Sequence, residues 1–171
     1  TKDATIDASN KTWQCTINTA LHPDGKYKIL VMALDISGKE TTVERGLTFD
    51  NTPPFVLMNL PQNYETNEFN GNITVSGNCE DMTGTESVTI TINDAQSTKS
   101  ISFNAIISQP ALNTSRAVVV DGQPVSGTQN WSYTFNSKDY ITSTGTYWFH
   151  INAVDEVGNG NTIFFHYDNI R

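Results

Sequence analysis

Residues 145–159 read GTYWFHINAVDEVGN, and residues 25–39 read GKYKILVMALDISGK. Both stretches follow the pattern G-x-Y-x-h-x-h-x-A-x-D-x-x-G, in which h is an apolar residue. Apolar residues at every second position have the period of a half-buried β-strand, and Asp-x-x-Gly is typical of a turn. Each stretch therefore predicts a strand that leads into a β-hairpin. In the later stretch, Tyr147, Phe149, Ile151 and Ala153 are predicted to face the core.

The similarity extends beyond these two stretches, from Trp13 to Asn51 and from Trp131 to Asn169. The separation is 131 − 13 = 118 residues at the tryptophans and 147 − 27 = 120 at the tyrosines, so one loop carries a two-residue insertion. A repeat of this length indicates two copies of one structural unit.

The boundary between the copies is predicted at Pro53-Pro54, because proline cannot donate a hydrogen bond inside a central strand. Residues 1–52 then form the C-terminal portion of one module, and residues 53–171 form a complete module. The first copy matches the second only from about its fourth or fifth strand onward. We therefore expect residues 1–52 to be completed by upstream chain, a second copy or a donated strand.

Further alternating segments bounded by turn residues predict the remaining strands. About seven strands in a module of this size are the expectation for an immunoglobulin-like β-sandwich, so the predicted fold class is all-β. The expected strands are Lys26–Asp35, Thr41–Phe49, Phe55–Leu60, Asn72–Gly77, Glu86–Asn93, Lys99–Ile107, Arg116–Val120, Thr146–Asp155 and Asn161–Tyr167.

The repeated motif, closing on DNTPP at residues 50–54, resembles the tandem immunoglobulin-like domains of bacterial surface and secreted proteins. The resemblance implies that Tyr27 and Tyr147 are tyrosine corners, with the ring in the core and the hydroxyl bonded to nearby backbone. It also implies an extracellular or cell-surface module that acts as a spacer or contacts other proteins. Because this fold hosts many functions, an adhesin module for glycan or host protein and an accessory domain of a secreted hydrolase remain alternatives.

Charge and hydropathy restrict the partners. The chain has 10 basic and 18 acidic residues, a net charge of −8, which disfavours nucleic acid and anionic lipid as partners. No apolar run approaches the roughly 20 residues that span a bilayer, so no membrane insertion is expected. The expected partners are adjacent modules of the same chain or further copies of it, with glycan as an alternative.

Residues with catalytic chemistry do not form a recognisable set. His22, His150 and His166 have no metal-ligand spacing, and the sequence contains no glycine-rich phosphate loop. We therefore expect no enzymatic activity. Cys15 and Cys79 fall in phase with apolar strand residues and are expected to be small buried hydrophobic residues rather than a disulfide.

Four aromatic and imidazole side chains are predicted on an outer face. Trp148 and His150 lie on one strand, and Phe164 and His166 lie on the next, all in the outward phase. Such a face is most often covered by a neighbouring module, a loop or a partner protein. Exposed rings also stack on sugars, so glycan binding at these residues is the alternative.

Carboxylate and amide oxygens collect at the predicted module ends. Hard cations such as Ca²⁺ take six to eight oxygen ligands, so these groups predict a candidate calcium site, and no other cofactor is expected. The alternative is that Asp and Asn stabilise turns by mimicking backbone hydrogen bonds. The candidate ligands are Asp50, Asn51, Glu80, Asp81, Asp155 and Glu156.

Overall fold

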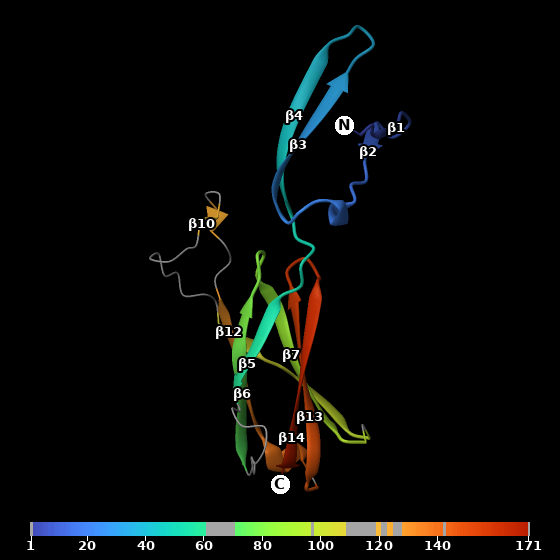
Figure 1. The fold of residues 1–171 in the computed structure, drawn as a ribbon. Helices are drawn as coiled ribbons and strands as arrows, with labels where there is room; N and C mark the ends of the chain where they lie inside the picture. Colours follow the sequence, from blue (N-terminus) through green and yellow to red (C-terminus); the bar gives the residue numbers. More distant parts are fainter. Residues whose placement is uncertain are drawn as a thin grey trace. The chain divides into compact units, whose positions relative to one another are not determined.

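The computed structural model describes residues 2–60, 71–96, 98–108, 119–120, 123–124, 128–141 and 143–170. The chain divides into two compact units, Thr1–Asn51 and Thr52–Arg171 (Figure 1). This division lies one residue before the expected boundary. The regular structure is almost entirely antiparallel β-strand, which confirms the predicted fold class. Within the described residues, no helix has the length and hydropathy needed to cross a membrane.

The first unit contains β1 (Thr5–Asp7), β2 (Thr12–Gln14), the 3-10 helix η1 (Thr19–Leu21), β3 (Gly25–Leu34) and β4 (Glu40–Phe49). The second unit contains β5 (Phe55–Leu60), β6 (Asn72–Glu80), β7 (Thr85–Asp94), β8 (Ser100–Asn104), β9 (Ile106–Ile107), β10 (Val119–Val120), β11 (Gln123–Pro124), β12 (Gln129–Asn136), α1 (Ser137–Tyr140), β13 (Gly145–Asp155) and β14 (Gly160–Ile170).

The second unit is a sandwich of two four-stranded sheets, in the orders β5-β6-β12-β9 and β14-β13-β7-β8 (Figure 1). A separate short pair is formed by β10 and β11. The order is that of an immunoglobulin-like sandwich, in which the strand with the tyrosine corner pairs with one hairpin partner and one strand from earlier in the chain. Here β13 fills that position, between β14 and β7.

The core lies between these two sheets. Phe149, Ile151 and Ala153 of β13 are fully buried, and they pack in one cluster with Val75 of β6 and Trp131 of β12. Tyr147 is also buried, so the predicted phase of this strand is confirmed. The alternation works because successive side chains of a strand point to opposite faces, and only one face of each sheet meets the other sheet.

The two long hairpins end in turns with the same hydrogen bonds. In the β3–β4 turn, Oδ1 of Asp35 accepts hydrogen bonds from the amides of Ser37 and Lys39, both at 2.8 Å. In the β13–β14 turn, Oδ1 of Asp155 accepts from the amides two and four residues ahead, at 2.9 and 2.8 Å. The glycine of each turn has a positive φ, 84° and 97°, which glycine adopts without strain. The repeated Asp-x-x-Gly pattern therefore encodes one turn geometry.

The segment predicted as one strand over Lys99–Ile107 is instead two strands, so that prediction was wrong. The chain leaves β7 after β8 and crosses to β12 as β9. The change of sheet occurs at Ala105, whose amide donates to the Val88 carbonyl at 2.8 Å. Of the predicted strand Arg116–Val120, residues 116–118 lie outside the described residues.

The main element of the first unit is the β3–β4 hairpin, and a small cluster of aromatic side chains lies at one end of it. Among the described residues, β3 pairs with β4 alone. Tyr27 of β3 stacks on Phe49 of β4 with ring centroids 4.4 Å apart, and its hydroxyl donates to the Pro23 carbonyl at 2.6 Å. Trp13 is 55% exposed, whereas its counterpart in the repeat, Trp131, is 2% exposed. Among the described residues, the tryptophan of the repeat is therefore enclosed in the second unit and exposed in the first.

Candidate functional site

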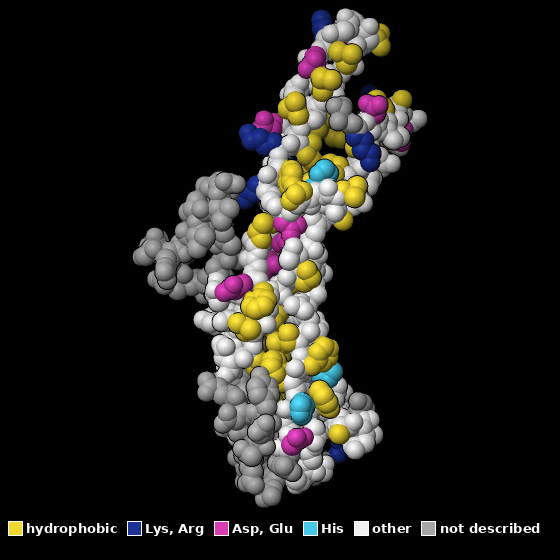
Figure 2. All heavy atoms as spheres, in the orientation of Figure 1, with side chains coloured by type: hydrophobic (Ala, Val, Ile, Leu, Met, Phe, Trp, Pro, Cys, Tyr) yellow, Lys and Arg dark blue, Asp and Glu magenta, His cyan; other side chains and the backbone are white. Residues whose placement is uncertain are grey.

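The four predicted residues of the outer face lie together on the β13–β14 hairpin. Trp148 is paired with His166 and His150 with Phe164 across the two strands. The Trp148 and His166 rings are tilted with centroids 5.0 Å apart, and the His150 and Phe164 rings meet edge to face at 4.9 Å. Trp148 is 40% exposed and Phe164 is 59% exposed. Figure 2 shows histidine and hydrophobic side chains next to one another on the visible face of this unit.

Strands β7 and β8 extend this face with hydroxyl and amide side chains that the sequence prediction of the site did not include. The alternating Thr-x-Thr-x-Asn pattern of residues 89–93 predicts a strand with a polar outward face, but it does not predict which strand lies beside it. Residues that are paired across the four strands form rows on this face. In the order β14-β13-β7-β8, the first of the three central rows is His166, Trp148, Asn93 and Ser100. The second is Phe164, His150, Thr91 and Ser102, and the third is Thr162, Asn152, Thr89 and Asn104.

Hydrogen bonds within the rows hold the short polar side chains in place. The hydroxyls of Thr91 and Ser102 are 2.8 Å apart, and the Thr162 hydroxyl donates to the Asn152 amide oxygen at 2.9 Å. The Asn93 amide nitrogen lies 3.4 Å from Nε2 of His150. We name these three rows the outer face of the second unit. Its aromatic rings lie beside short side chains that are hydrogen-bonded to one another.

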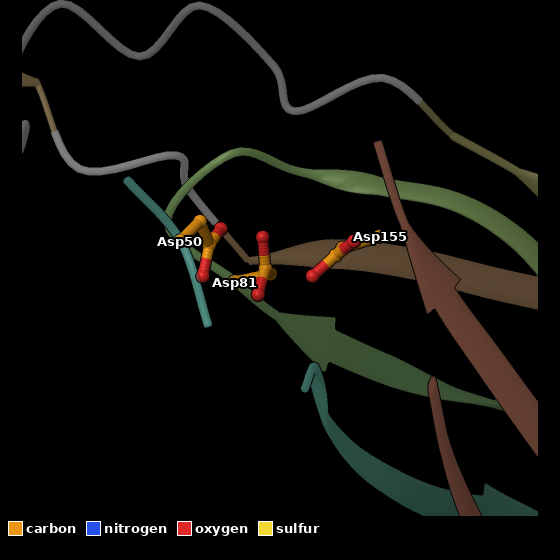
Figure 3. A group of neighbouring side chains, drawn as sticks. All are labelled: Asp50, Asp81 and Asp155. Carbon is orange, nitrogen blue, oxygen red and sulfur yellow. The ribbon is translucent and has the colours of Figure 1, made fainter. Parts of the chain in front are cut away.

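Two of the predicted calcium ligands come together in the second unit. Asp81 follows β6 and Asp155 ends β13, and each offers a carboxylate oxygen within 4.8 Å of the other. Figure 3 shows these two carboxyl groups pointing toward each other. Both also form turns: Oδ1 of Asp81 accepts from the amides of Thr83 and Gly84, at 2.8 and 2.9 Å. Asp155 is fully buried. The turn interpretation and the calcium interpretation therefore apply to the same side chains.

The remaining predicted calcium ligands are Asp50, Asn51, Glu80 and Glu156. Asp50 and Asn51 belong to the first unit, where the side-chain amide of Asn51 donates to Oδ1 of Asp24 at 2.8 Å. Glu80 accepts a hydrogen bond from the Thr128 hydroxyl at 2.9 Å. Glu156 is exposed beside the turn. Neither glutamate joins the Asp81 and Asp155 carboxylates.

The two cysteines are not a disulfide, as expected. Cys79 is buried in the core of the second unit, as expected, whereas Cys15 of the first unit is half-buried, so the expected burial of Cys15 was wrong. Burial raises the pKa of the Cys79 thiol to about 11, so this group is protonated at neutral pH. A protonated, enclosed thiol behaves as a small hydrophobic side chain.

Neither a protein-family model nor a curated protein matches this chain.

Proposed function

We propose that the chain is a non-enzymatic part of a larger bacterial surface or secreted protein, in which immunoglobulin-like modules in series space other parts and contact their neighbours. The observation that carries this proposal is the repeated hairpin. Both copies have a Tyr hydroxyl bonded to a carbonyl four residues upstream, at 2.6 Å for Tyr27 and 2.9 Å for Tyr147. Both also have the Asp-bonded turn at the opposite end.

A spacer must limit the motion between its modules. The segment that joins the units contains Pro53-Pro54, and proline restricts the backbone to a narrow range of φ. Pro54 is also tied to the second unit, because the Asn161 amide donates to its carbonyl at 3.0 Å. Restricted backbone rotation at the prolines is what a stiff connection requires.

The proposal is tested by the distribution of distances between a fluorophore on each unit, measured by single-molecule energy transfer. We expect a narrow distribution in the native chain. Insertion of Gly-Ser-Gly-Ser between Thr52 and Pro53 should broaden it, whereas a length-matched insertion of four prolines should shift it and keep it narrow. A native distribution as broad as that of the Gly-Ser variant would contradict the spacer function.

A further inference from the structure

We propose that the outer face of the second unit binds a neutral saccharide chain, with Trp148 and Phe164 as its stacking surfaces. This goes beyond a spacer function, because it assigns a ligand to one face of one module. The two rings occupy diagonal positions of neighbouring strands, since Trp148 is paired with His166 and Phe164 with His150. Diagonal neighbours are about 7–8 Å apart between backbones, close enough for large side chains to share one ligand.

The rings suit sugar stacking because their faces carry partial negative charge and sugar C–H groups carry partial positive charge. Both rings are about half exposed, at 40% and 59%. The adjacent imidazoles of His166 and His150, at 5.0 and 4.9 Å, limit the motion of the rings. A ligand therefore meets side chains that are already ordered, which lowers the entropy cost of binding.

The polar part of the face suits sugar hydroxyls. Ser100, Ser102 and Asn104 of β8 are exposed, and Thr91 and Asn93 of β7 lie between them and the rings. Hydroxyl and amide groups both donate and accept hydrogen bonds, as sugar hydroxyls do. These side chains are short, so little rotamer freedom is lost when they bind.

The charge of the face selects a neutral ligand. The three rows contain no carboxylate, ammonium or guanidinium group, although the whole chain carries a net charge of −8. Single-stranded nucleic acid also stacks on aromatic rings, but it needs a positive groove. A protein interface has a core of large apolar side chains and Arg, whereas here short hydroxyl and amide side chains make up β7 and β8. The observations therefore favour a saccharide over both.

The repeat shows that the hairpin itself does not require these rings. The outward positions of β3 that correspond to Trp148, His150 and Asn152 are Lys28, Leu30 and Met32, and they pair with Gly46, Glu44 and Thr42 of β4. The same hairpin is therefore built with aliphatic and charged side chains on that face. The aromatic rings are specific to the second unit.

The test measures binding of neutral hexasaccharides of glucose, N-acetylglucosamine, mannose and xylose to the 171-residue chain, by calorimetry and by amide chemical shifts. We expect one of them to bind at millimolar or lower concentration and to shift the amides of β13 and β14. Trp148→Ala and Phe164→Ala should each weaken binding by about tenfold or more. The matched control is Phe55→Ala, since Phe55 is 57% exposed on the other sheet and should leave binding unchanged.

Circular dichroism and melting of each variant separate loss of binding from loss of fold. Equal weakening by Phe55→Ala would place the site elsewhere and overturn the proposal. Absence of binding for every neutral hexasaccharide would also overturn it, as would tighter binding of anionic saccharides. Light scattering that shows a dimer abolished by Trp148→Ala would replace the saccharide with a second copy of this chain.

Discussion

At the scale of single residues, the core of the second unit depends on a tryptophan packed over a glycine. Trp131 is paired with Gly77 across β12 and β6. A Cβ atom on Gly77 would lie 2.5 Å from the Trp131 ring and 1.8 Å from the Leu57 carbonyl oxygen. Neither contact can be relieved by rotating a flexible side chain, because one neighbour is backbone and the other is a buried ring.

We therefore expect Gly77→Ala to lower the free energy of unfolding by about 3 kcal/mol, the upper end for overpacking a core. Urea denaturation measures this change. Gly145→Ala is the control, because an added Cβ at Gly145 meets no atom within 4 Å. Equal losses for the two variants would mean that the close packing of Trp131 does not set the requirement for glycine.

The tyrosine corner gives a second prediction at this scale. Tyr147 is buried, and its hydroxyl donates to the Ser143 carbonyl at 2.9 Å, as the resemblance to immunoglobulin-like domains implies. Tyr147→Phe keeps the ring and removes this bond, so it should cost about 1 kcal/mol of stability. Tyr140→Phe, in α1 where the side chain is 39% exposed, should cost much less in the same denaturation experiment. A loss of similar size at both positions would contradict this role.

At the scale of elements, the β3–β4 turn depends on the ionised Asp35 carboxylate. Hydrogen bonds from the Ser37 hydroxyl and from the Lys39 amide lower the pKa of Asp35 below its usual value of 3.8. A carboxyl with a lowered folded-state pKa contributes stability above its unfolded value, and that contribution is lost as the pH falls through the folded value. The turn should therefore loosen only below about pH 3.8.

The test is an NMR titration of the Asp35 side chain. Ser37→Ala removes the largest cause of the shift and should raise the pKa of Asp35 toward 3.8. Asp7, whose pKa is lowered by the Asn10 side chain, serves as the internal reference and should not change. An unchanged Asp35 pKa in the variant would mean that the hydroxyl does not stabilise the carboxylate.

The calcium prediction is tested at the Asp81 and Asp155 carboxylates, which approach within 4.8 Å. Like charges this close repel, and a divalent cation would offset that repulsion. If calcium binds with the affinity of extracellular modules, a concentration ten times the Kd adds about 1.4 kcal/mol of stability and raises the Tm by several degrees. Asp81→Asn should reduce the rise. Equal Tm values in calcium and in EDTA would leave these residues with the turn role alone.

At the scale of the whole molecule, the local sequence pattern predicts those structural features that depend on residues close together in the sequence. The inward phase of β13 follows from period-two alternation, whereas the bonded hydroxyl of Tyr147 is what the resemblance to immunoglobulin-like domains implies. The division of the Lys99–Ile107 segment does not follow, because its alternation continues while the hydrogen-bond partner changes from β7 to β12. The change of partner depends on which segments, distant in sequence, lie beside this one in the folded chain.

The same distinction holds for the candidate sites. The sequence pattern could place four residues of the outer face together because they share one hairpin, whose register follows from its turn. These residues are Trp148, His150, Phe164 and His166. The contribution of β7 and β8 to the outer face was missed, because it depends on which strand lies beside β13. The approach of Asp81 to Asp155 brings together two segments far apart in the sequence. The sequence identifies individual candidate residues, and the order of strands in the sheets places those residues close together.

We propose that β3–β4 and β13–β14 are copies of one element, which pairs with a third strand in the second unit and, among the described residues, not in the first. Hydrogen exchange in the monomeric chain, with light scattering to confirm the monomer, tests it most directly. Amides of β13 lie between two strands over a fully buried face, whereas those of β3 have β4 as their one partner among the described residues. We predict slow exchange throughout β13 and fast exchange at the β3 amides that point away from β4. Equal protection of β3 and β13 in the monomer would contradict the account.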